Sequence, residues 1–122
     1  MSAFNWFQTE KRAYEMRTVN WTADEAALTA KTGRTADNFI IDRVIRVTTT
    51  SGGENKTITV PDGEYYGQRL LVILEVLGDD ETLNVTCSTG DSGTQMTGAG
   101  GYSDLCWMGS TLGWVELSNE AT

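Results

Sequence analysis

Hydrophobic and polar residues follow one another in strand-like runs along most of the chain after residue 38. An alternation with a period of two is typical of β-strands, because successive side chains of a strand point to opposite faces. The connections between the runs are mostly short and rich in glycine, aspartate or asparagine, which favours hairpins between antiparallel neighbours. The predicted strands are residues 39–50, 56–60, 69–77, 82–88, 104–108 and 113–117.

One longer connection, residues 89–103, and the composition of the chain also bear on the fold class. Residues 89–103 are rich in glycine and are expected to form either a mobile loop or a weak extra strand around residues 94–97. A length of 122 residues fits one domain with one modest core. The chain is rich in threonine, with 13 glycines and a single proline, as in β-proteins. We therefore expect an all-β fold, either an antiparallel β-sandwich or a small barrel-like domain.

The first part of the chain differs from the rest. Residues 1–21 contain many large apolar side chains but keep neither a strand period nor a helix period, so we interpret them as an arm that orders on a partner. A capping box at residues 22–25 and a glycine at Gly33 favour a short helix, with an extended polar connection as the alternative. The expected division is an arm with a possible short helix over residues 1–38 and a β domain over residues 39–122. The candidate partner-binding residues of the arm are Phe4, Trp6, Phe7, Tyr14 and Trp21.

The predicted strand at residues 69–77 is apolar on both of its faces. In an extended chain Leu70, Val72 and Leu74 share one face, whereas Leu71 and Ile73 lie on the other. Both faces then need cover, and a small sandwich covers only one of them. We expect a partner subunit or the arm to cover the second face, because large exposed apolar patches are uncommon in monomers. The candidate subunit-interface residues are Leu70, Leu71, Val72, Ile73 and Leu74.

Charge divides the chain into two unequal halves. Residues 1–50 carry seven basic and six acidic side chains, whereas residues 51–122 carry two basic and eleven acidic ones, within a net charge of −8. Nucleic-acid binding requires a basic stripe, which the sequence lacks, so we expect no nucleic-acid partner. No apolar run reaches the roughly 18 residues of a membrane span, and the N-terminus lacks the apolar segment of a signal peptide. We expect synthesis in the cytoplasm and no membrane partner.

Residues with catalytic or metal-binding chemistry are sparse. The chain has no histidine, and Cys87 and Cys106 do not form a C-x-x-C pair, so an ordinary zinc site is not expected. Motifs such as G-x-S-x-G and the P-loop are missing, and the acidic run at residues 79–81 fits a solvated turn. We expect no catalytic residues, no metal and no cofactor, hence no enzyme. The two cysteines are predicted to be buried thiols, with a disulfide possible if the strands at 82–88 and 104–108 are neighbours.

Aromatic residues of the β region fit two interpretations. In a β-protein such side chains commonly belong to the core or to an interface, but they can also stack on sugars, as in carbohydrate-binding modules. The residues concerned are Tyr65, Tyr66, Tyr102, Trp107 and Trp114.

Three segments, TITVPDGEYYGQRLLVILE, ETLNVT and DLCWMGSTLGWVEL, resemble a β module found in virion proteins of tailed bacteriophages. The resemblance covers about residues 55–118, and such modules occur in head decoration (cement) proteins and in tail fibres, where they assemble as trimers. It implies a homotrimer that binds the major capsid protein on the exterior of the capsid and stabilises the phage head. The alternatives are a tail-fibre or adaptor segment and a receptor-binding or carbohydrate-binding module.

Overall fold

A computed structural model describes residues 16–21, 27–33, 41–49, 55–78 and 82–122, with the backbone alone described for residues 16–21. This part of the chain is all-β, as predicted, with one short helix. Its elements are β1 (Met16–Trp21), β2 (Ala27–Thr29), β3 (Val44–Thr49), β4 (Lys56–Val60), β5 (Arg69–Val76), β6 (Leu83–Cys87), β7 (Tyr102–Trp107), α2 (Gly109–Leu112) and β8 (Trp114–Glu120).

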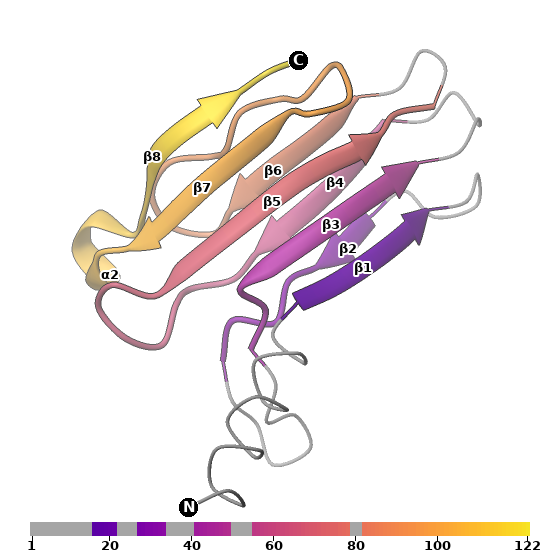
Figure 1. The fold of residues 1–122 in the computed structure, drawn as a ribbon. Helices are drawn as coiled ribbons and strands as arrows, with labels where there is room; N and C mark the ends of the chain where they lie inside the picture. Colours follow the sequence, from indigo (N-terminus) through magenta and orange to yellow (C-terminus); the bar gives the residue numbers. More distant parts are fainter. Residues whose placement is uncertain (1–15, 22–26, 34–40, 50–54, 79–81) are drawn as a thin grey trace, which may run out of the picture.

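The strands form two sheets, which are sheet A with the order β1-β3-β5-β7-β8 and sheet B with the order β2-β4-β6 (Figure 1). From β1 to β6 the chain alternates between the sheets, and within each sheet these strands run parallel. We call one strand of sheet A and the strand of sheet B that follows it a coil. Three coils are stacked in this way, and β7 and β8 extend sheet A as an antiparallel pair.

The predicted antiparallel pairing is therefore wrong for the first six strands and holds only where β5, β7 and β8 meet. Parallel neighbours need a crossover connection, and here each crossover contains a strand of the opposite sheet. Val44 lies beside Leu71, and Lys56 beside Leu83, so the second and third coils are 27 residues apart (71 − 44 and 83 − 56). Turns that look like hairpin turns in the sequence instead carry the chain from one sheet to the other.

The core lies between the two sheets. Alternate residues of β3 and β5 in sheet A pack against alternate residues of β4 and β6 in sheet B, and these side chains have essentially no exposed surface. Each such burial stabilises the fold by about 1.5–3 kcal/mol. The two sheets stay separate among the described strands, so the chain forms a sandwich of stacked coils. The core residues concerned are Ile45, Val47, Ile58, Val60, Leu70, Val72, Leu74, Leu83 and Val85.

Two segments assigned by the sequence to the arm belong to the sheets. Residues 16–21 form β1, an edge strand of sheet A parallel to β3, although their side chains gave no clear strand period. Residues 27–29, expected in a short helix, form β2 beside β4, and Ala30 just after β2 is buried in the core. An isolated helix of this length is marginal, so pairing with β4 outweighs the helix signal. The predicted boundary at residues 38 and 39 lies outside the described residues, between β2 and β3.

The glycine-rich segment at residues 89–103 contains the weak strand pairing that was one of its two predicted forms. Met96 exchanges two backbone hydrogen bonds with Leu83, at 3.0 and 2.8 Å, and its side chain is fully buried. The Glu116 carboxylate holds the same segment, because it accepts hydrogen bonds from the Thr94 amide at 2.6 Å and from the Ser103 hydroxyl at 2.6 Å. This segment is therefore tied to both sheets.

Candidate functional site

The outward face of β5 is the first candidate surface. Its outward side chains are Arg69, Leu71, Ile73 and Glu75, which we call the outer row. Leu71 and Ile73 are partly exposed and lie beside two further partly exposed side chains, Val44 of β3 and Tyr102 of β7, respectively. The apolar centre of this face therefore extends over three strands of sheet A.

The predicted subunit-interface residues divide between the two faces of β5. Leu70, Val72 and Leu74 have no exposed surface, because sheet B of the same chain already covers them. An interface role for these three residues is wrong, since a partner has nothing left to cover. Leu71 and Ile73 point away from the core, and their place in an interface stays a prediction.

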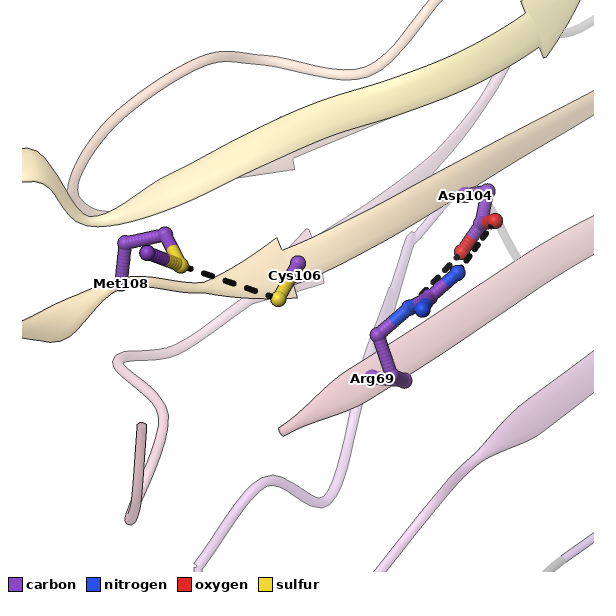
Figure 2. Close-up of polar contacts among 4 residues, drawn as sticks. All are labelled: Arg69, Asp104, Cys106 and Met108. Carbon is purple, nitrogen blue, oxygen red and sulfur yellow. Dashed lines mark hydrogen bonds and ion pairs between the residues drawn. The ribbon is translucent and has the colours of Figure 1, made fainter. Parts of the chain in front are cut away.

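Two ion pairs border the apolar centre of the outer row. Arg46 meets Glu75 through two contacts, Nε to Oε1 at 2.7 Å and Nη2 to Oε2 at 3.0 Å. Arg69 meets Asp104 in the same two-point manner, with Nη2 to Oδ2 at 2.6 Å (Figure 2). The hydrogen bonds from Arg46 hold the pKa of Glu75 below its usual range. An apolar centre with a polar border is the usual composition of a protein interface.

The second candidate surface lies at one end of the molecule. We call it the tip patch, and it consists of Tyr65, Tyr66, Met108 and Leu112, which are 52%, 77%, 39% and 61% exposed. These are four of the six large apolar side chains that are exposed among the described residues. The turn from β4 to β5 and the turn that contains α2 carry them, and both turns lie at the same end of the sheets (Figure 1).

Hydrogen bonds join these two turns. The Gly67 amide donates to the Trp107 carbonyl, and the Trp107 amide donates to the Gln68 carbonyl, both at 2.8 Å. The buried Gln68 side chain holds the first turn, because its Nε2 donates to the Thr32 carbonyl at 2.8 Å and its Oε1 accepts from the Glu64 amide at 2.6 Å. Sequence reasoning missed Gln68, which belongs to no motif and whose partners cannot be read from its neighbours.

The five aromatic candidates occupy three different environments. Trp107 and Trp114 are in the core, with ring centroids 5.5 Å apart in an edge-to-face contact. The Trp114 indole Nε1 donates to the Pro61 carbonyl at 2.8 Å, which satisfies its single donor. Tyr102 lies on the outward face of sheet A, and the two neighbouring tyrosines lie in the tip patch. Two of the five aromatic residues are therefore highly exposed.

Of the five candidates in the arm, only the backbone of Trp21 is among the described residues. Phe4, Trp6, Phe7 and Tyr14 lie outside the described residues. The backbone of Trp21 ends β1 opposite Thr49. Their role in partner binding stays a prediction.

Both cysteines are buried and unpaired, as predicted. Cys87 belongs to β6 in sheet B and Cys106 to β7 in sheet A, so the two strands are not neighbours. Burial, together with the carboxylates of Asp91 and Glu116, raises the pKa of the Cys87 thiol to about 12. The Cys106 sulfur lies 3.8 Å from the Met108 sulfur (Figure 2). A thiol with a raised pKa is a poor nucleophile at neutral pH, so Cys87 is inert there.

The described residues contain no cluster of metal ligands. Among them, no three or more Cys, Asp or Glu side chains are grouped so that they could hold a metal ion. The acidic run at residues 79–81 lies outside this part of the chain. In the described ranges no helix is long and apolar enough to cross a membrane.

Comparison with protein-family models finds no match to this chain, and comparison with curated proteins finds none either. In the described part of the chain, the outer row and the tip patch are the two candidate surfaces.

Proposed function

We propose that this protein is a structural virion protein, a decoration or cement protein that binds the major capsid protein shell of a tailed phage and stabilises the head. The observation that carries the proposal is the outer row, where Leu71 and Ile73 form a partly exposed apolar centre between two bidentate ion pairs. Such a face suits contact with other copies of the chain, and the sequence resemblance favours three copies.

The mechanism is mechanical. In each subunit the coils are joined strand to strand in two sheets, so a load on one coil is shared by the backbone hydrogen bonds of its neighbours. Contacts between subunits through the outer row add to this framework. The arm, with Phe4, Trp6, Phe7 and Tyr14, bridges neighbouring capsid subunits, and Trp21 lies where β1 ends. Three weak arms that bind at once behave as one strong contact, because the second and third binding events become intramolecular.

Sedimentation with purified phage heads tests this function. The full-length protein is mixed with expanded and with unexpanded heads, and bound copies are counted after sedimentation. We expect saturable binding to expanded heads in multiples of three, together with a trimer by light scattering. A chain that lacks residues 1–14, and so keeps β1, should retain its fold but bind heads more weakly. A protein that ignores both kinds of head would contradict the proposal, and binding to tails instead would favour a tail-fibre or adaptor role.

A carbohydrate-binding or receptor-binding module is the second candidate function. The observation that favours it is the pair of neighbouring exposed tyrosines, Tyr65 and Tyr66, since exposed aromatic rings can stack on sugar rings. A glycan array separates the two functions. A decoration protein should give no selective signal, whereas a glycan binder should give a signal that Tyr66→Ser removes.

A further inference from the structure

We propose that the tip patch is a docking surface for a protein partner that offers an apolar depression bordered by lysine or arginine. This inference rests on the proposed function, because that function supplies the partner, a protein of the phage head. The tip patch lies beyond the start of β5 and gives the chain a contact surface separate from the outer row and from the arm.

The exposed side chains of the tip patch stand on a fixed backbone. Gly63 has no room for a side chain because the Trp107 ring lies against it, and Gly109, which packs against the Tyr66 ring, has a φ of 89° that favours glycine. The Gly113 amide donates to the Gly109 carbonyl at 2.7 Å and so closes the turn that carries Leu112. A preorganised surface loses little conformational entropy on binding. Its tyrosines are of the residue type that is enriched at the energetic centres of interfaces.

Charge around the tip patch points to a basic partner. Asp62 and Glu64 are exposed in the turn that carries the two tyrosines. Asp62 accepts a hydrogen bond from the Ser88 hydroxyl at 2.7 Å, which holds its pKa below the usual range and keeps it ionised. Arg69, the one cation in residues 61–69, is paired with Asp104 (Figure 2), and residues 107–113 contain no charged side chain. Within these two turns the patch therefore combines an apolar centre with acidic neighbours, and the exposed Lys31 and Arg43 lie farther along the same end of the sheets.

Other kinds of partner fit this surface less well. Nucleic acid and anionic lipid headgroups are repelled by Asp62 and Glu64, because like charges oppose association. A sugar site needs polar side chains beside its aromatic rings to bind hydroxyl groups. Here Met108 and Leu112 are apolar and both ends of the Gln68 amide are engaged inside the chain, so only Asp62, Glu64, Ser110 and Thr111 are exposed polar side chains of these turns that a sugar could use. An apolar protein surface with a basic border satisfies all of these features.

The test compares two double variants for binding to purified expanded heads. Tyr66→Ser with Leu112→Ser changes the tip patch. Val76→Ser with Leu117→Ser is the matched control, because those side chains are 51% and 52% exposed but lie outside the patch. Both variants should keep the circular dichroism spectrum and melting transition of the natural protein. We expect the tip variant to bind about tenfold more weakly and the control to stay within about twofold.

A charge variant provides the second measurement. Raising the salt from about 50 to about 500 mM should weaken binding of the natural protein, because the Debye length shortens. Glu64→Gln should bind more weakly at low salt and show a smaller salt dependence.

Each alternative result overturns the inference in a distinguishable way. If the natural protein binds heads and both double variants bind equally well or equally poorly, the tip patch is not the docking surface and the proposed function stands. If the natural protein does not bind heads, both the proposed function and the inference about the tip patch are wrong. If it gives a glycan-array signal that Tyr66→Ser removes, the patch binds sugar.

Discussion

The two faces of β5 carry similarly apolar side chains but have different roles. Leu70, Val72 and Leu74 are sealed between the sheets, whereas Leu71 and Ile73 lie on the outward face between two ion pairs. A strand with two apolar faces must be covered on both sides, but its sequence does not reveal what covers each face. Sheet B covers the inner face, and the outer face is where we place other copies of the chain.

Breaking the inner face should have the largest effect. Val72→Asp places a carboxylate among fully buried apolar side chains, where an unpaired charge costs several kcal/mol, so we expect the chain to lose its fold. Circular dichroism and urea titration measure this loss. The milder Val72→Ala should keep the fold and lower the free energy of unfolding by about 1–3 kcal/mol. A folded, stable Val72→Asp protein would show that the inner face is not sealed.

The outer face should respond to the same charge without unfolding. Ile73→Asp lies on the partly exposed side of β5, so the chain should keep its melting transition as a monomer. The proposed trimer should dissociate, because the carboxylate would be buried unpaired in the proposed subunit contact. Analytical ultracentrifugation measures the mass. A trimer that persists with Ile73→Asp would move the interface away from the outer row.

The buried thiol of Cys87 allows the inner face of sheet B to be tested in the same way as the inner face of β5. Its pKa is raised from 9.0 to about 12, so the folded chain resists forming the thiolate. Above about pH 9 the unfolded chain loses this proton while the folded chain keeps it, which favours unfolding. The free energy of unfolding is therefore unaffected by ionisation of Cys87 below about pH 9 and falls as the pH rises toward about 12. Cys87→Ala should cost about 1–3 kcal/mol at neutral pH and should flatten the fall in melting temperature between about pH 8 and pH 10.5. An equally steep fall in both proteins would contradict a buried, protonated Cys87.

The ion pairs of the outer face should have the smallest effect. The pKa of Glu75 is lowered by its hydrogen bonds to Arg46, so its contribution is complete above the usual carboxyl pKa and is lost as the pH falls through the lowered value. Both side chains are exposed to solvent, so the change in stability should be small. Urea titrations at about pH 6 and about pH 3 should show slightly more acid destabilisation in the natural protein than in Glu75→Gln. A greater acid sensitivity in Glu75→Gln would reverse this account.

Much of the fold was predictable because strand alternation is local. Each strand from β3 to β8 overlaps a segment predicted from the sequence, whereas β1 and β2 were missed. The stacking of coils also left a signal that hairpin reasoning overlooked, a T-x-x-x-G repeat at residues 29–33, 59–63 and 86–90. Thr29, Thr59 and Thr86 lie side by side in sheet B. A spacing of 27 to 30 residues between such repeats is typical of stacked architectures.

The candidate surfaces were predictable only in part. The outer row follows from the alternation of Leu71 and Ile73 with core residues, which the sequence displays directly. The tip patch does not, because it depends on a turn near residue 66 meeting a turn near residue 110. The two turns pack closely because Gly63 leaves space for the Trp107 ring and Gly109 leaves space for the Tyr66 ring. No local pattern reveals such a pairing.

Stacked coils also make the length of this protein adjustable in steps. Each coil pairs only with the coils next to it, and neighbouring strands in a sheet lie about 4.8 Å apart. A whole coil inserted before β3 would move the N-terminal residues by that increment away from β8. The hydrogen bonds that join the two turns of the tip patch through Trp107 would remain, whereas the contact between Gln68 and Thr32 would be interrupted by the inserted coil. In such a fold the distance from β1 to β8 is set by the number of coils.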